Sequence, residues 1–366
     1  MRRNHGTPLF AKTLAVVGCL LHSAPSLATC DNPTLGSGQT TTCNNSAPNP
    51  STIPIAAMGG SSGVTINVLQ GAAIDVNNGN AILVHDRSRV TNEGSLSVTG
   101  DTFDGISAQS AGAQGNALIN RGSITTNGDG SEGMFSSTRA TSLLNDVTGT
   151  IRTLGPHSAG MVDFKSPGGN TLVNNGRIET AGPGSHAMAI AAPTGSVVNN
   201  GTLTTGGLGS AGMFSAGDIS GQAPNGSGTA TLINNGAIQT DGRGGIGIGI
   251  VVLNTALTPV TNNGTIVSRG PESGGAFLNG PTTFVNGAGA SISAPLGDGV
   301  IANGGGTVRN AGTISAPGMA SFSAARPSST TAARLPAPDS SPSSRPVRRI
   351  SVSPTPATWP GPIPPC

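Results

Sequence analysis

The sequence predicts an all-β protein whose main part is a right-handed parallel β-helix, or β-solenoid, of about ten turns. The first observation is a degenerate repeat of 25 to 35 residues that recurs within residues 63–318. The second is the composition: Gly accounts for 57 of 366 residues, and charged side chains for only 9%, against roughly 25% in an average domain. Small aliphatic side chains dominate the apolar fraction, which suits many short strands around a narrow core.

Each repeat can be numbered from a glycine that ends an Asn-rich turn. These glycines, at position zero, are Gly94, Gly122, Gly149, Gly176, Gly201, Gly236 and Gly264. Position +2 is always Leu or Ile: Leu96, Ile124, Ile151, Ile178, Leu203, Ile238 and Ile266. Position +12 is mostly Met or Ile: Ile106, Met134, Met161, Met188, Met213, Ile248 and Ala276. Because this register is constant, the length variation falls after position +12, at one corner that tolerates insertions.

Neighbouring turns of a β-solenoid lie about 4.8 Å apart, so residues at the same repeat position stack on one another. Positions +2 and +12 therefore predict two interior columns. The small residue at +11 indicates a crowded corner or a positive φ: Gly105, Gly133, Gly160, Ala187, Gly212, Gly247 and Gly275. Asparagine at position −2 predicts a ladder of stacked amides that only Val147 interrupts: Asn92, Asn120, Asn174, Asn199, Asn234 and Asn262.

The repeat weakens towards both ends. Residues 63–90 alternate apolar and polar side chains and predict the first one or two turns in a slightly different frame. The segments "VNGAGASIS" (285–293) and "VRNAGTIS" (308–315) are degraded copies of the turn and strand, and 215–229 is the longest insertion. Residues 319–366 are rich in Pro, Ser and Arg, which predicts a disordered tail. Either a frameshift or a genuine Pro-rich linker accounts for it.

Residues 1–28 have the pattern of an export signal. A basic start is followed by the apolar run "TLAVVGCLL", too short to span a bilayer, and by the small residues of "SLA" for cleavage. Lipidation at Cys19 is the alternative. Residues 29–62 then form an N-terminal cap segment in which Cys30 and Cys43 are expected to form a disulfide, since an exported chain oxidises; two incidental thiols are the alternative. No other segment is long and apolar enough for a transmembrane helix.

The export signal, the Cys-bearing segment and the motifs "GVTINVLQGAAIDVNNGNAI", "VTNNGTIVSRG" and "LVNNGRIETAGPGSHAM" resemble the passenger regions of Gram-negative autotransporters. The resemblance covers roughly residues 1–318. It implies passage through the periplasm, display at the cell surface or release, and an adhesive or structural role. It also implies a C-terminal translocator barrel, which we expect this chain to lack because its tail shows no run of amphipathic strands.

The residue types favour binding over catalysis. Eight Phe, one Trp and no Tyr leave few aromatic platforms for sugars, and His85, His157 and His186 are isolated in the sequence. We therefore expect a non-enzymatic secreted or surface protein without a cofactor. It would bind host or neighbouring-cell surface molecules, and a formal charge of +2 gives no reason to expect nucleic acid. A truncated or frameshifted remnant without function and a β-helical enzyme acting on polysaccharides are the alternatives.

The register also predicts one cluster of carboxylates. Asp101 and Asp129 share position +7, and Asp104 and Glu132 share position +10 of adjacent turns. Oxygen ligands at this density suit Ca²⁺, which takes six to eight of them. Solvated carboxylates on a turn and an acid/base pair are the alternatives.

Calcium titration tests this cluster. If the site exists, isothermal titration of the full chain gives binding in the millimolar range or tighter, and Asp101→Asn with Asp129→Asn abolishes it, because each change removes a charged oxygen ligand. Heat that is absent, or unchanged in the double variant, would leave the four side chains as ordinary surface carboxylates.

Overall fold

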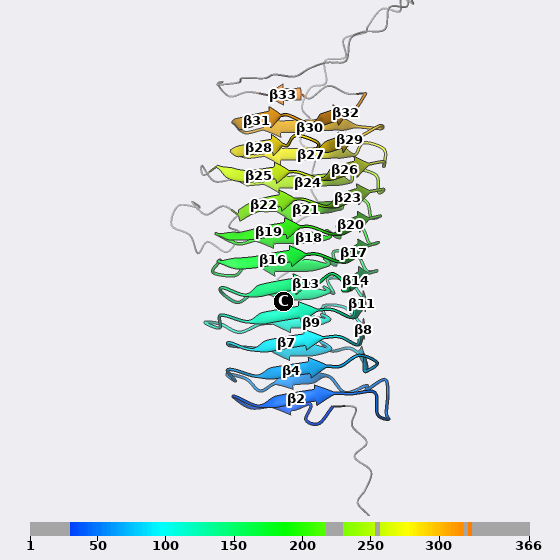
Figure 1. Ribbon diagram of the computed structural model, residues 1–366, viewed down its shortest axis with the longest axis vertical. Helices are drawn as coiled ribbons and strands as arrows, with labels where there is room; N and C mark the ends of the chain where they lie inside the picture. Colours follow the sequence, from blue (N-terminus) through cyan, green and yellow to red (C-terminus); the bar gives the residue numbers. More distant parts are fainter. Residues whose placement is uncertain (1–29, 217–229, 253–256, 318–320, 324–366) are drawn as a thin grey trace, which may run out of the picture. The chain divides into compact units, whose positions relative to one another are not determined.

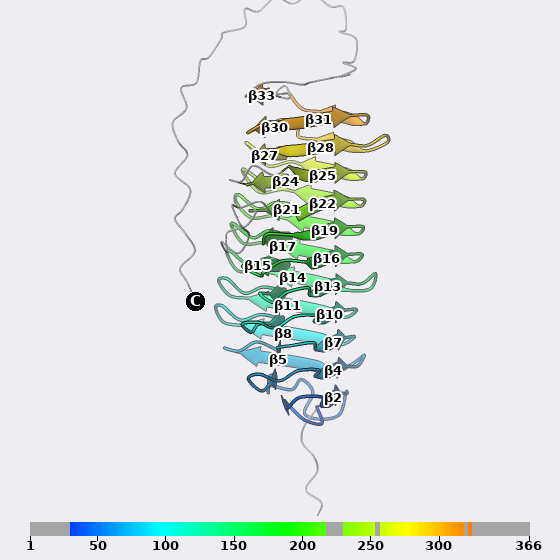
Figure 2. The same cartoon turned by 90° about the vertical axis from the view of Figure 1, so that its left-hand side faces the viewer.

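The computed structural model describes residues 30–216, 230–252, 257–317 and 321–323. These ranges contain strands and turns but no helix, and every strand pair in them is parallel. The strands form three sheets in a solenoid of about nine turns (Figures 1 and 2). The predicted all-β parallel solenoid is therefore confirmed, with about one turn fewer than expected.

Each full turn gives one strand to each sheet, in the order A, C, B. Sheet A contains β2 (Thr40–Cys43), β4 (Thr65–Val68), β7 (Arg89–Asn92), β10 (Ala117–Asn120), β13 (Ser142–Asn145), β16 (Asn170–Asn174), β19 (Gly195–Asn199), β22 (Ala230–Asn234), β25 (Thr258–Asn262), β28 (Thr282–Asn286) and β31 (Gly306–Asn310). Sheet C contains β5 (Ala73–Asn77), β8 (Ser95–Thr99), β11 (Ser123–Asn127), β14 (Thr150–Thr153), β17 (Arg177–Thr180), β20 (Thr202–Thr205), β23 (Ala237–Thr240), β26 (Thr265–Ser268), β29 (Ser291–Ser293) and β32 (Thr313–Ser315).

Sheet B completes the turn. It contains β1 (Thr34–Leu35), β3 (Ile55–Ala57), β6 (Ile82–Val84), β9 (Ile106–Ala108), β12 (Met134–Ser136), β15 (Met161–Phe164), β18 (Met188–Ala191), β21 (Ala211–Ser215), β24 (Ile246–Val251), β27 (Gly274–Asn279), β30 (Asp298–Asn303) and β33 (Ser321–Ser323). Strand β33 pairs with β30, so the ladder of sheet B includes residues beyond 318. The remainder of the predicted tail, the predicted export signal and residues 217–229 lie outside the described residues.

Both predicted interior columns are present. Ile151 pairs with Ile124 on one side and with Ile178 on the other, and Met161 pairs with Met134 and Met188. Every residue at +2 and +12 in the seven numbered repeats is at most 1% exposed. The inward side chains of the three sheets join one continuous apolar cluster, so the core exists only through the stacking of turns.

The asparagine ladder is longer than the sequence predicted. Eight hydrogen bonds of 2.7–2.8 Å, each from a side-chain Nδ2 to the Oδ1 on the next turn, join nine buried or half-buried asparagines at the ends of the sheet A strands: Asn92, Asn120, Asn145, Asn174, Asn199, Asn234, Asn262, Asn286 and Asn310. The predicted gap at Val147 was wrong. The turn there is two residues longer, so Asn145 holds the position and Val147 is exposed.

Two glycine columns are required by close approach. A Cβ on Gly122 would lie 2.0 Å from the carbonyl oxygen of Gly94, and a Cβ on Gly160 would lie 2.2 Å from Cγ2 of Ile178. Neither residue has a positive φ, so the corner at +11 is crowded, the first of the two predicted reasons. The exception at +11, Ala187, precedes Leu203, which has no Cγ2 methyl group to meet it. Steric fit between turns thus explains the choice of residue.

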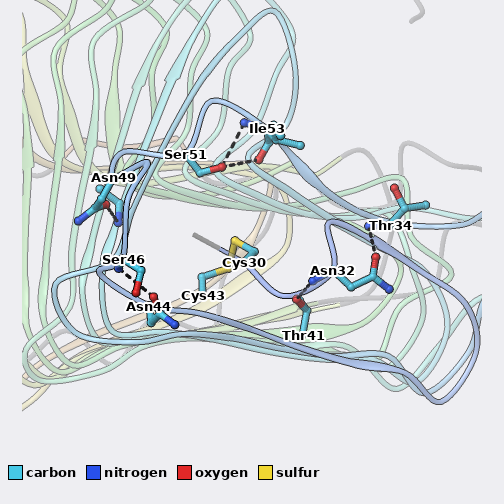
Figure 3. Close-up of a disulfide and its surroundings, with 11 residues drawn as sticks. Cys30, Asn32, Thr34, Thr41, Cys43, Asn44, Ser46, Asn49, Ser51 and Ile53 are labelled. Atoms are coloured by element: carbon cyan, nitrogen blue, oxygen red, sulfur yellow. Dashed lines mark hydrogen bonds between the residues drawn. A yellow bond between two sulfur atoms is a disulfide. The ribbon is translucent and has the colours of Figure 1, made fainter. Parts of the chain in front are cut away.

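The predicted cap segment contains strands of the solenoid itself. Strands β1 and β3 extend sheet B and β2 extends sheet A, while Ser51 forms an isolated bridge to Ile74 of sheet C. The predicted disulfide joins Cys30 to Cys43, and both half-cystines are buried. Figure 3 shows it beside Thr41, whose Oγ1 accepts a hydrogen bond from the backbone N–H of Asn32 at 3.0 Å. The disulfide thus closes the first turn.

Substitution of Gly160 tests the crowding at +11. Gly160→Ala should lower the free energy of unfolding by about 1–3 kcal/mol because the new methyl group meets Ile178, and a second change, Ile178→Leu, should recover part of that loss. Thermal and urea unfolding of the full chain measure both. Gly59→Ala is the matched control, since nothing lies within 4 Å of its added Cβ. If both alanine variants unfold alike, steric crowding is not why glycine occupies +11.

Candidate functional site

The structure brings the four predicted carboxylates together as two pairs. At position +7, the backbone N–H of Asp129 donates to Oδ1 of Asp101 at 2.8 Å. Oδ1 of Asp129 lies 2.9 Å from Nδ1 of His157, and both of these side chains are 55% exposed. The two carboxylates at +7 therefore lie on a solvated turn. His157, which is isolated in the sequence, has the Asp129 carboxylate as a partner in the structure.

The pair at +10 is different because Asp104 is buried. Its Oδ2 accepts a hydrogen bond from Ser107 Oγ at 2.7 Å, and its Oδ1 accepts one from the backbone N–H of Glu132 at 3.2 Å. Burial raises the pKa of Asp104, and the hydrogen bonds from Glu132 and Ser107 oppose that rise. The side chain of Glu132 is a further hydrogen-bond partner of Asp104, so the two carboxyl groups lie close together.

Within the ranges that the structure describes, no group of three or more His, Cys, Asp or Glu side chains could hold a metal ion. Asp101 and Asp129 are exposed, whereas Asp104 is buried and Glu132 is half-buried. A calcium site at Asp101, Asp104, Asp129 and Glu132 stays a prediction for the titration above to decide.

An aromatic surface on sheet B is the feature that sequence reasoning missed. Phe135, Phe164 and Phe214 are half-buried and pack against Ala159, Val162 and Ala189, a cluster separate from the solenoid core. We call these six residues the aromatic face. Phe135 lies between two inward residues of β12, so it points outward. The signal was present at position +13, where Phe135, Val162, Ala189 and Phe214 stand in register.

Two basic side chains border the aromatic face. The His186 ring stacks on Phe214 with centroids 4.4 Å apart and planes 16° apart, and its Nδ1 accepts a hydrogen bond from the backbone N–H of Ala211 at 3.0 Å. Burial, with a smaller contribution from His157, lowers the pKa of His186 to about 4. The ammonium of Lys165 lies 5.1 Å from the centre of the Phe164 ring. His186 is therefore a neutral, packed side chain and not a solvated one.

An open cleft adjoins this face at the ends of β6, β9, β12 and β15. Its volume is about 530 Å³, and it is lined by Leu83, His85, Gln109, Ser110, Ala111, Ser137 and Lys165. A chain of hydrogen bonds links it to the carboxyl pair: Gln109 Nε2 donates to Ser107 Oγ at 2.7 Å, and Ser107 donates to Asp104. The cleft thus offers polar groups next to an apolar surface.

A second, smaller cleft of about 230 Å³ shares His85, Ser110 and Ala111 with the first. It contains Asp86, which accepts a hydrogen bond from Ser62 Oγ at 2.9 Å and pairs with Arg87 at 2.8 Å. The hydrogen bond from the backbone N–H of Gln114, more than these two partners, lowers the pKa of Asp86. This carboxylate is satisfied within the protein.

Fold and surface together define a parallel β-solenoid protein with an apolar outer face on sheet B beside an open polar cleft. Residues 29–288 match the family model described as BigA third pectate lyase-like domain, and the chain belongs to that family. No curated protein and no solved structure matches the chain. The disulfide fits a protein that folds outside the reducing cytosol. None of the described residues belongs to a helix long and apolar enough to cross a membrane.

The half-buried imidazole of His186, stacked on Phe214, predicts a dependence of stability on pH. The folded pKa of His186 is about 4, below the ordinary value of 6.5, so its contribution is complete above pH 6.5 and is lost as the pH falls towards 4. Between pH 7 and 4.5 the wild type should lose roughly 1–2 kcal/mol relative to His186→Gln. Urea unfolding of both proteins at both pH values measures the difference. Parallel pH profiles for wild type and His186→Gln would contradict the assignment.

Proposed function

We propose that this chain is a non-enzymatic, exported binding protein of the autotransporter passenger type, with an adhesive or structural role at a cell surface. The observation that carries the proposal is the aromatic face. Three of the eight phenylalanines of the chain gather there, outside the solenoid core. Contiguous apolar surface bordered by polar groups is typical of an interaction site.

The geometry of the solenoid suits such a role. The parallel sheets hold Phe135 and Phe214 on turns three apart, so about 14 Å separates their strands. A partner therefore meets preformed side chains on a rigid sheet, and little ordering of the protein opposes binding. Lys165, His85 and Gln109 at the adjacent cleft add polar contacts that give orientation.

Export is supported by two independent features. The sequence begins with a signal-like segment, and the first turn is closed by the Cys30–Cys43 disulfide. The partner we propose is a surface molecule of a host or neighbouring cell.

A polysaccharide-acting enzyme is the alternative that one observation favours. Asp104 and Glu132 form a carboxyl pair of the kind that acid/base catalysis uses, and hydrogen bonds connect Asp104 to the open cleft. Incubation of the chain with polygalacturonate and Ca²⁺, monitored for new unsaturated ends by absorbance and for new reducing ends, separates the two functions. Products that Asp104→Asn abolishes would establish the enzyme.

Cell binding tests the main proposal. The labelled full chain should bind cultured epithelial monolayers saturably, and Phe135→Ser with Phe214→Ser should weaken binding at least tenfold, because aromatic anchors carry much of the energy of an interface. Val173→Ser with Val198→Ser is the matched control, since these half-buried residues lie on the outer side of sheet A. Melting curves confirm that both double variants fold. Equal binding by wild type and the phenylalanine variant would rule out the aromatic face.

A further inference from the structure

One carboxylate lies inside the solenoid, and neither the aromatic face nor the carboxyl pairs include it. Asp163 occupies an inward position of β15, where it is 0% exposed. In register, its neighbours are Ser136 of β12 on one side and Ile190 of β18 on the other. An acid therefore stands in a column that the next turn fills with an aliphatic side chain.

The surroundings of Asp163 offer no compensating charge. Neither of its carboxylate oxygens makes a hydrogen bond of ordinary length and angle. Ser136 on β12, Asn170 on β16 and Ile190 on β18 are the side chains that the packed strands present to it, and none of them titrates. The nearest base in sequence, Lys165, directs its ammonium over the outer ring of Phe164.

An isolated ionised carboxylate in such a position is costly, and protonation is the usual relief. Burial raises the pKa of Asp163 to about 7, and the polar side chains of Ser166 and Asn170 offset only part of that rise. The acid is thus neutral in the folded protein at mildly acidic pH, and its ionisation falls near neutrality.

Asp163 also adjoins a strained corner, residues 164–169, which carries one residue of the aromatic face and one residue of the open cleft. The next residue is Phe164 of the aromatic face, and after it comes Lys165 of the cleft, which adopts a positive φ of 55°. Gly168 and Gly169 follow with φ of 97° and 80°. A rearrangement that brings Asp163 to water would displace this corner first.

We propose that Asp163 is a pH-sensitive switch within the solenoid, whose neutral carboxyl keeps the corner 164–169 packed and whose ionisation opens it. On opening, the proton passes to solvent and the charged carboxylate gains access to water. The effect on binding rests on the proposed function of the aromatic face; the effect on the corner does not.

The direction of the pH effect follows from the raised pKa. The folded state binds the proton more tightly than the open state, so protection of the corner is complete below the ordinary pKa of about 4 and falls as the pH rises to about 7. A shift of this size corresponds to a change in the opening equilibrium on the order of a thousandfold.

Hydrogen exchange on the full chain tests the switch. Amides of β15 and the corner, including Lys165 N–H, which donates to the Ala191 carbonyl at 3.0 Å, are followed in wild type and Asp163→Asn at pH 5 and pH 8. Comparison at equal pH removes the intrinsic exchange rate. We expect the ratio of the wild-type to the Asp163→Asn exchange rate to rise at least tenfold between pH 5 and pH 8. If Asp163→Asn fails to fold, Asp163→Val replaces it, because the next residue of the same column, Ile190, is also aliphatic.

Two results would overturn the proposal. One is equal exchange of wild type and Asp163→Asn at pH 8, so that Asp163→Asn has no more effect than the control Asp75→Asn, which changes an exposed carboxylate on β5. The other is full protection of wild type at pH 8 in 10 mM CaCl₂ or 150 mM NaCl but not without salt, which would mean that a cation and not a proton neutralises Asp163. Cell binding at pH 6 and pH 8 is measured separately. If the chain does not bind cells, the proposed function fails, but the hydrogen-exchange result still tests the switch.

Discussion

The asparagine ladder is the interaction on which the rest of the solenoid depends. A carboxamide both donates and accepts, so each asparagine can be satisfied by the same residue on the turns before and after it. The eight side-chain bonds between Asn92 and Asn310 run through the buried corner that follows sheet A. A shift of any turn by one residue would break two of these bonds and move the apolar column to the outside. Register, core and outer surfaces therefore follow from one repeated contact.

The glycine columns also fix how adjacent turns stack, because there is no space for a side chain between them. Where the ladder brings two turns to a fixed separation, the zero position leaves no room for a Cβ. At +11 the fit depends on the branching of the side chain on the next turn, as Ala187 with Leu203 shows against Gly160 with Ile178. A chain with few aromatic residues and few charges can be stable in this way because its contacts repeat between all adjacent turns.

The sequence was informative where a structural role has a constant spacing. The columns at +2 and +12 could be read directly, because each turn reuses the same residue type at the same interval. Asn145 was missed because its turn is two residues longer, which hides the column from a count that starts at Gly149. The strands within residues 29–62 were missed because they have no repeat signature of their own and pair only with later turns.

The candidate site was harder to predict than the core. The pairs Asp101–Asp129 and Asp104–Glu132 followed from register, but the burial of Asp104 and the exposure of the first pair depend on neighbours across the sheet. Phe135 and Phe214 are far apart in sequence, and position +13 between them is occupied by Val162 and Ala189, so the shared feature is apolarity and not aromaticity. Asp163 was missed although it stands two residues after the inward Met161, because an acid in a strand pattern is normally assigned to the outer side.

The residue at +11 packs against the residue at +2 of the next turn. A segment that could be exchanged between copies without disturbing this contact therefore does not coincide with the sequence repeat that begins at the asparagine turn. Gly160 and Ile178 belong to different sequence repeats but to one contact. An exchange between copies that cuts between these two residues can join an alanine to an isoleucine and produce a clash, even though each half is native. If the exchanged segment begins at one +11 position and ends just before the next, the +11 residue and the +2 residue that it contacts stay in the same segment. Around Ala187, duplication or loss of a turn avoids this clash when the exchanged unit begins at +11 and not at the asparagine turn.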